Sequence, residues 1–394
     1  MDPVRNPFAP GAGSQPPELA GRDEILARAT TTLRRVSAGK HARSLVLLGL
    51  RGSGKTVLLN RFELLAEQEG HLTAFIEAPE DGSLAELLYP RIHQVLRKLS
   101  VIEKARASAH RALRVLRAFA SAFELSVGEV TISVDPEPGT ADSGILEYDL
   151  SELLVRVGEA AASAQRGVTL LVDEIQYLST EELSALIVAI HRLNQRRLPI
   201  ILLGAGLPQV AGLSGNAKSY AERLFDFTAI GALDAAAAAE AIREPLADEG
   251  ESITDDALQM IVERTRGYPY FLQEWGFQAW NAANDSPIGV ADVELASERA
   301  VERLDEGFFR VRFDRLTPKE REYVIAMARS GDGPYRSSEV AQALGQSVQS
   351  LGPRRAKLIR KGMIYSPAHG DIAFTVPMFE DFLRRTVRPP RADP

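Results

Sequence analysis

The segment that decides the fold reads Ser44-Leu-Val-Leu-Leu-Gly-Leu-Arg-Gly-Ser-Gly-Lys-Thr56. Its first five residues are almost wholly apolar, which is typical of a buried parallel strand. The eight residues from Gly49 to Thr56 match the pattern G-x-x-x-x-G-K-[ST] of a phosphate-binding loop. Helical periodicity follows from Val57 to Gln68. A strand, this loop and a helix in that order predict a site for nucleotide phosphates.

Each residue type in the loop has a chemical reason. Its glycines let backbone N–H groups close around phosphates without clashes from Cβ atoms. Lys55 supplies a positive charge to the β- and γ-phosphates, and the Thr56 hydroxyl is suited to ligate magnesium. We therefore predict that ATP and Mg²⁺ bind here, although the loop alone does not exclude GTP. The predicted binding residues are Gly49, Leu50, Arg51, Gly52, Ser53, Gly54, Lys55 and Thr56.

A second apolar run, Val168-Thr-Leu-Leu-Val172, ends in Asp173 and Glu174. In a phosphate-loop enzyme an acidic pair at a strand end has two tasks. Asp173 is predicted to hold magnesium, and Glu174 to act as the general base towards the attacking water. The alternative is that the pair only caps the following helix. Gln176 is predicted either to orient water or to be an ordinary surface glutamine.

Other short runs alternate with helical segments and predict the fold class. His71 to Glu77 and Pro199 to Leu203 are strand-like, and Glu181 to Arg196 has helical periodicity. Such alternation indicates an α/β fold with a doubly wound parallel sheet. Between the second strand and the Asp-Glu strand we expect an insertion at about 87–140. It is helical from Leu87 to Phe123, and a hairpin follows at 125–134.

The insertion has a basic segment. Two interpretations of it remain open: it contacts nucleic acid, or it is a solvated charged face. Between Arg91 and Arg117 it carries eight Lys and Arg residues against only Glu103.

The remaining segments suggest an arm and two further domains. Five prolines within the first 17 residues indicate a flexible or extended N-terminal arm over residues 1–16. An all-helical lid is expected at 231–310. In residues 311–394, Thr317-Pro-Lys-Glu320 predicts a capped helix. Two short helices and a two-stranded turn follow, which together predict a winged helix. The phosphate-loop core then spans 17–230.

The C-terminal segment is basic. From Arg315 onward there are 14 Lys and Arg residues against 8 Asp and Glu, although the chain as a whole has a net charge of −7. A basic domain favours a negatively charged partner; the alternative is that it attracts the acidic remainder of the chain. In the expected recognition helix, Ser347, Gln349 and Ser350 are candidates for contact with base edges. The cations predicted to meet DNA phosphates are Arg354, Arg355, Lys357, Arg360 and Lys361.

Composition excludes several classes of protein. With no cysteine, the chain has no disulfide, thiolate zinc site or cysteine nucleophile. No apolar run approaches the roughly 20 residues needed to cross a bilayer, and the N-terminus lacks the features of a secretory signal. We expect a cytoplasmic protein.

With these motifs the chain resembles the AAA+ superfamily, in the branch of the origin-recognition initiators and the related archaeal-type and STAND ATPases. Pro17-Glu-Leu-Ala-Gly21-Arg22-Asp23-Glu24 is similar to the segment that borders the adenine in that branch. Gly267-Tyr-Pro269 is similar to a lid motif that approaches the base. The resemblance implies that Gly21, Arg22 and Pro269 lie near the nucleotide and that the third domain is a winged helix.

Two further features concern catalysis: Arg223, and the end of the strand that follows the Asp-Glu strand. Arg223, in Ser219-Tyr-Ala-Glu-Arg223, stands where that branch often carries an arginine facing the γ-phosphate, within the chain or on a neighbour; it could instead anchor a loop. Many AAA+ proteins also end the strand after the Asp-Glu strand with a polar side chain. Here that strand ends in Gly204-Ala-Gly206, so we expect slow or regulated ATP hydrolysis.

The sequence thus predicts an ATPase that acts as a nucleotide-dependent switch and binds double-stranded DNA through its winged helix. A STAND-like signalling ATPase, whose winged helix contacts protein, is the alternative. An ATP-binding regulatory subunit with negligible turnover is a third interpretation. A protein partner or a homo-oligomer is compatible with each of them.

Overall fold

The computed structural model describes residues 1–11, 19–125 and 139–386, and the expected hairpin at 125–134 lies almost entirely outside them. The chain divides into two compact units, which are described separately. The sheet unit comprises residues 23–49 and 55–230. The helical unit comprises residues 1–22, 50–54 and 231–394.

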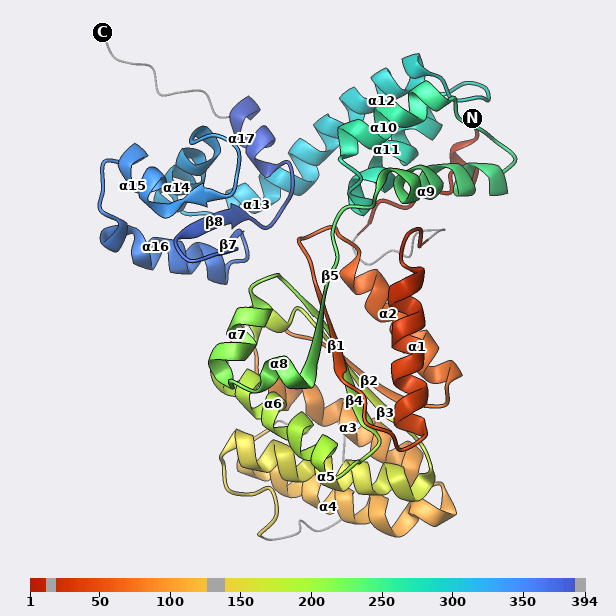
Figure 1. Cartoon of the computed structure of the whole chain (residues 1–394), viewed down its shortest axis with the longest axis vertical. Coiled ribbons are helices and arrows are strands. Elements are labelled where there is room, and N and C mark those ends of the chain that lie inside the picture. The colour runs from red at the N-terminus through yellow and green to blue at the C-terminus, as the bar shows by residue number, and fades with distance from the viewer. Residues whose placement is uncertain (12–18, 126–138, 387–394) are drawn as a thin grey trace. The chain divides into compact units, whose positions relative to one another are not determined.

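A five-stranded, fully parallel sheet forms the centre of the sheet unit, as predicted (Figure 1). The strand order is β2-β3-β4-β1-β5, so the phosphate-loop strand β1 lies between β4 and β5. The strands are β1 (Ser44–Leu48), β2 (Leu72–Glu77), β3 (Val168–Asp173), β4 (Ile200–Gly206) and β5 (Phe225–Ala229).

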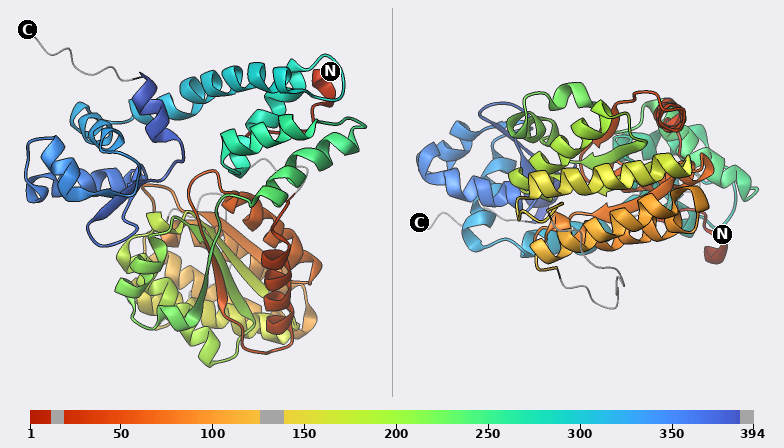
Figure 2. Two further views of the ribbon diagram at one scale, coloured as in Figure 1. Left: turned by 45° about the horizontal axis from the view of Figure 1, so that its top comes forward. Right: turned by 90° about the horizontal axis from the view of Figure 1, so that it is seen from below.

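Helices cover both faces of this sheet (Figure 2). Because side chains alternate along a strand, β1 contributes to both cores. Leu45 and Leu47 pack with α1 and α2, whereas Val46 belongs to the core beneath α3, α5 and α6. The helices are α1 (Asp23–Ser37), α2 (Lys55–Gln68), α3 (Leu84–Ser100), α4 (Arg106–Ala122), α5 (Leu146–Ala164), α6 (Thr180–Gln195), α7 (Val210–Ala217) and α8 (Ala221–Leu224).

Residues 235–314 of the helical unit form helices joined by short connections. Its long helices enclose an aromatic core that includes Phe271, Trp275 and Trp280. The elements are α9 (Ala235–Asp248), α10 (Asp255–Thr265), α11 (Pro269–Ala282), α12 (Val290–Arg303), the π-helix η4 (Leu304–Phe309) and α13 (Arg310–Asp314).

Helices and short strands make up the rest of this unit. The predicted capping box is present at α14, where Thr317 and Glu320 each bind the other's backbone N–H. The strands form an antiparallel sheet in the order β6-β8-β7. The elements are α14 (Pro318–Arg329), β6 (Tyr335–Arg336), α15 (Ser337–Ala343), α16 (Val348–Arg360), β7 (Ile364–Tyr365), β8 (Asp371–Phe374) and α17 (Phe379–Thr386).

One expectation about this unit was wrong. The start of the N-terminal arm is not free: Phe8 is only 3% exposed and packs against Gly276 of α11. The Asn6 side chain also donates to the Phe277 carbonyl at 3.0 Å. Prolines prevented a long helix here, but they did not prevent docking.

No helix in the described ranges combines the length and apolar character needed to cross a bilayer.

Candidate nucleotide-binding and hydrolysis site

Lys55 is the first residue of α2 and is only 6% exposed. Its ammonium Nζ donates to the carbonyl of Gly49 at 3.0 Å, so the lysine holds the first residue of the phosphate loop. A buried ammonium is stable only with hydrogen-bond partners or an anion. The arrangement therefore presents a positive charge, at the start of a helix, where an anionic phosphate is expected.

The Thr56 hydroxyl donates to Oδ2 of Asp173 at 2.6 Å. Asp173 ends β3 and is 2% exposed, and its Oδ1 accepts from the Glu174 N–H at 2.8 Å. Burial raises the pKa of Asp173 and outweighs the hydrogen bond from Thr56, which lowers it. A hydroxyl and a buried carboxylate that face each other are oxygen ligands of the kind that magnesium prefers. These residues fit the cation that the sequence predicts.

The raised pKa of Asp173 predicts a change in stability. A carboxyl whose pKa is higher in the folded state adds stability below its unfolded pKa and loses it as pH rises through the folded value. We expect Asp173→Asn to unfold at a higher temperature than the parent at pH 7 without metal, with a smaller gap at pH 5. Thermal unfolding at both pH values measures this, with Asp81→Asn at an exposed position as control. A lower unfolding temperature at pH 7 would contradict the prediction.

Glu174 and Gln176 are connected at the end of β3. Glu174 has a left-handed backbone (φ 53°), and the short helix η3 (Ile175–Tyr177) follows it. The Gln176 amide Nε2 donates to the Glu174 carboxylate, and its Oε1 accepts from the N–H of Leu207 at 3.0 Å. Gln176 therefore lies at the end of β4, where the sequence offers no polar side chain. The sequence alone did not place Gln176 beside β4.

The middle of the phosphate loop contacts other residues of the helical unit. Gly52 and Gly54 have φ of +82° and +90°, which favour glycine. The N–H of Tyr270 donates to the Gly52 carbonyl at 3.2 Å, one residue after Pro269, the first residue of α11. Arg22 donates to the carbonyls of Gly231 at 2.7 Å and Ser53 at 3.5 Å.

Burial lowers the pKa of Arg22. Gly21, which precedes it, packs against α9, because a Cβ atom added to Gly21 would lie 2.7 Å from the Cβ of Ala237.

Arg223 is not brought to the other predicted catalytic residues of its own chain. Its side chain is exposed on α8, just before β5. Phe225, which opens β5, pairs with Ser44 at the start of β1, whereas the phosphate loop follows Leu48 at the other end. The two strand ends are separated by roughly 13 Å along the strand.

The predicted DNA-contacting residues divide into two groups. Lys357 and Arg360 are exposed on α16, and Arg354 is partly exposed. Arg355 instead donates to Ser366 at 2.9 Å, and Lys361 pairs with Glu320 of the capping box at 2.7 Å. These two side chains therefore have acceptors within the same unit.

The three polar residues near the start of α16 also differ in position. The Ser347 hydroxyl caps the helix by accepting from the Ser350 N–H at 3.2 Å, and the Ser350 hydroxyl donates to the Ser347 carbonyl. Gln349 is exposed. Only Gln349 remains as a candidate for contact with a base edge.

In comparison with known families, residues 18–203 match a family model described as an AAA ATPase domain. Residues 306–383 match a family model described as a domain of unknown function (DUF8462). No curated protein matches the chain in sequence.

Among solved structures, the chain is similar to a Walker-type ATPase of Pyrococcus abyssi, with 17% identity, a TM-score of 0.59, and coverage of 93% of this chain and 96% of that chain. An Orc1 protein of Aeropyrum pernix, solved in complex with DNA, aligns with 15% identity, a TM-score of 0.48, and coverage of 97% of this chain and 96% of that chain. The first similarity shows a shared fold.

Proposed function

With an AAA ATPase domain at residues 18–203 as the premise, we propose that this chain is an ATP-binding switch that hydrolyses ATP slowly and binds double-stranded DNA. The observation that carries the ATPase part is the contact of Thr56 with the buried Asp173, beside the buried Lys55. A cation-ligand pair and a phosphate-directed lysine in one place are the requirements for binding ATP with magnesium.

The proposed reaction uses four residues of the sheet unit. Lys55 binds the β- and γ-phosphates, and Thr56 and Asp173 hold Mg²⁺. Magnesium supplies charge neutralisation to the phosphate oxygens. Glu174 accepts a proton from water while the water oxygen bonds to the γ-phosphorus. The bond from that phosphorus to the β–γ bridging oxygen breaks, and ADP and phosphate are formed.

We assign residues 17–230 to the ATPase core, 231–310 to a lid and 311–394 to a winged helix. The order α14, β6, α15, α16, β7, β8, with its small antiparallel sheet, supports the last assignment. The exposed Lys357 and Arg360 on α16 support contact with DNA phosphates, which gives affinity with little sequence reading.

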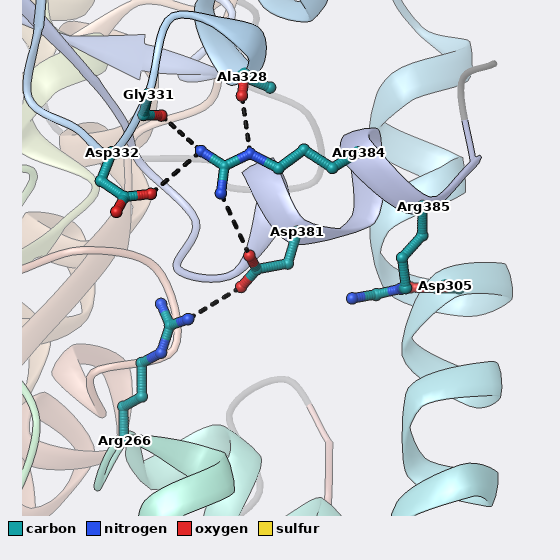
Figure 3. Close-up of polar contacts among 8 residues, drawn as sticks. All are labelled: Arg266, Asp305, Ala328, Gly331, Asp332, Asp381, Arg384 and Arg385. Atoms are coloured by element: carbon teal, nitrogen blue, oxygen red, sulfur yellow. Dashed lines mark hydrogen bonds and ion pairs between the residues drawn. The ribbon is translucent and has the colours of Figure 1, made fainter.

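Helix α17 supports a coupling between lid and winged helix (Figure 3). Arg266 is the C-cap residue of α10, immediately before Gly267-Tyr-Pro269, and donates to Asp381 of α17 at 3.1 Å. From the same helix, Arg385 pairs with Asp305 at 2.7 Å.

Arg384 of α17 completes this network (Figure 3). It donates to the Ala328 carbonyl at 2.8 Å, beside the end of α14, and pairs with Asp332 at 3.2 Å. We propose that a movement of the lid motif is transmitted through α17 to the end of α14, in the domain that also contains α16.

The proposed DNA binding predicts how the affinity for duplex DNA depends on salt concentration. We expect Lys357→Ala/Arg360→Ala to weaken binding of any duplex and to make the plot of log K against log salt concentration shallower by about 2, since each lost phosphate contact removes about 0.9. Filter binding over a salt series measures this. Lys319→Ala, at an exposed position on α14, should leave the slope unchanged. An unchanged slope in the double variant would show that α16 does not bind DNA.

The test of the whole proposal is nucleotide turnover, and duplex affinity, with ATP and with ADP. Tighter DNA binding with ATP than with ADP is expected. If nucleotide makes no difference and a protein is recovered instead with an ATP-locked variant, the signalling alternative holds. Arg223 is exposed just before β5, at the end of that strand away from the phosphate loop. We therefore propose that any action of Arg223 on a nucleotide is on one bound to a second copy of the chain.

A further inference from the structure

The Gln176 side chain is hydrogen-bonded at both ends. Its Nε2 donates to the Glu174 carboxylate, and its Oε1 accepts from the Leu207 N–H at 3.0 Å. Leu207 directly follows β4, whereas Glu174 directly follows β3. The amide therefore ties the predicted general base to the end of a neighbouring strand of the sheet.

Residues at the end of β4 lie close to this amide. A Cβ atom on Gly206 would lie 2.9 Å from Gln176 Oε1 and 2.7 Å from Cγ2 of Val210, so a side chain there would displace one of these neighbours. The Gly206 carbonyl also accepts from the N–H of Gly49, the first residue of the phosphate loop, at 3.1 Å. A continuous chain of hydrogen bonds and one peptide unit thus runs from Glu174 to Gly49.

We propose that Gln176 is a positioning residue that holds the Glu174 carboxylate for hydrolysis; this inference rests on the proposed ATPase function. A glutamate has three side-chain torsions, so the position of its carboxylate depends on the hydrogen bonds that it accepts. Because a misplacement of about 1 Å can reduce a rate about 100-fold, one fixed hydrogen bond has a large effect on catalysis. Gln176 supplies, at the end of β4, the polar group that Gly204-Ala-Gly206 lacks. Its hydrogen bond to Leu207 also connects Glu174 to the phosphate loop.

Gln176→Ala tests this role. We expect kcat for ATP to fall about 10- to 100-fold, while KM and the Kd for ATP change less than about twofold, because Lys55, Thr56 and Asp173 are untouched. Gln176→Asn should behave similarly, since its side chain is one methylene too short to reach both partners. Gln195→Ala, at an exposed glutamine on α6, is the matched control and should keep the parent kcat.

A second variant leaves Gln176 itself in place. Gly206→Ala puts a methyl group against the amide and should lower kcat in the same way, with ATP still bound. Gly212→Ala on α7, where an added Cβ meets nothing within 4 Å, is its control. Thermal unfolding of each variant shows whether the fold is retained.

The inference is overturned if Gln176→Ala keeps the parent kcat while Glu174→Gln is inactive. It is also overturned if Gln176→Ala loses ATP affinity together with kcat, which would indicate a general structural role. If the parent protein itself neither binds nor hydrolyses ATP, the proposed function fails, and that result is distinct from both.

Discussion

Replacement of Lys55 by alanine is expected to weaken ATP binding by roughly 30-fold or more. The ammonium is buried at the start of α2, and the proposed function directs its charge at the phosphates. Truncation of one partner in a buried charge pair costs about 2–5 kcal/mol, and 1.4 kcal/mol corresponds to a factor of ten in affinity. Isothermal titration calorimetry with ATP and Mg²⁺ measures the loss.

Thermal unfolding provides an independent measurement of the same variant. A ligand that binds only the folded state raises its stability. Lys55→Ala should therefore remain folded, but the rise in unfolding temperature produced by ATP should almost disappear. Lys40→Ala, at an exposed position in the same unit, should show the parent response. If Lys55→Ala binds ATP as tightly as the parent, Gly49 to Thr56 is not the nucleotide site.

Replacement of Glu174 by glutamine should abolish turnover while ATP remains bound. A positioned general base contributes about 10²- to 10⁴-fold to a rate, so kcat should fall by that amount. The substitution preserves side-chain shape, and the glutamine carbonyl can still accept from Gln176 Nε2. The Kd for ATP should therefore stay within about threefold of the parent.

Phosphate release in single-turnover conditions measures the chemical step of this variant directly. Glu181→Gln, an exposed glutamate in the first turn of α6, is the matched control and should turn over normally. Normal turnover by Glu174→Gln would require another base. If Glu174→Gln instead loses ATP affinity, Glu174 takes part in nucleotide binding and not in chemistry.

Some of these features could be predicted because they are local in sequence. The strand β1, the loop and α2 are contiguous, so apolar runs, glycines and one lysine suffice to recognise them. The capping box of α14 was equally predictable, because Thr317 and Glu320 are three residues apart. The alternation of strands and helices predicted a parallel sheet, since parallel strands need a crossover between them.

Other features depend on partners that are distant in sequence. Phe8 packs against α11, and Gln176 meets Leu207, because folding brings these segments together. Arg355 and Lys361 looked like DNA-contacting residues on a helical face. Their hydrogen bonds to Ser366 and Glu320 depend on how α16 lies against the rest of its domain.

The sequence by itself determined the phosphate loop, the Asp173-Glu174 pair and the α/β class, because the chemistry and periodicity of each lie within a short stretch of chain. Only the tertiary structure decided that Gln176 fills the polar position at the end of β4 and that Arg223 lies at the far end of β5. It also showed which cations of α16 remain exposed. Strand order and helix packing set these distances, and neither is encoded in the spacing of residues along the chain.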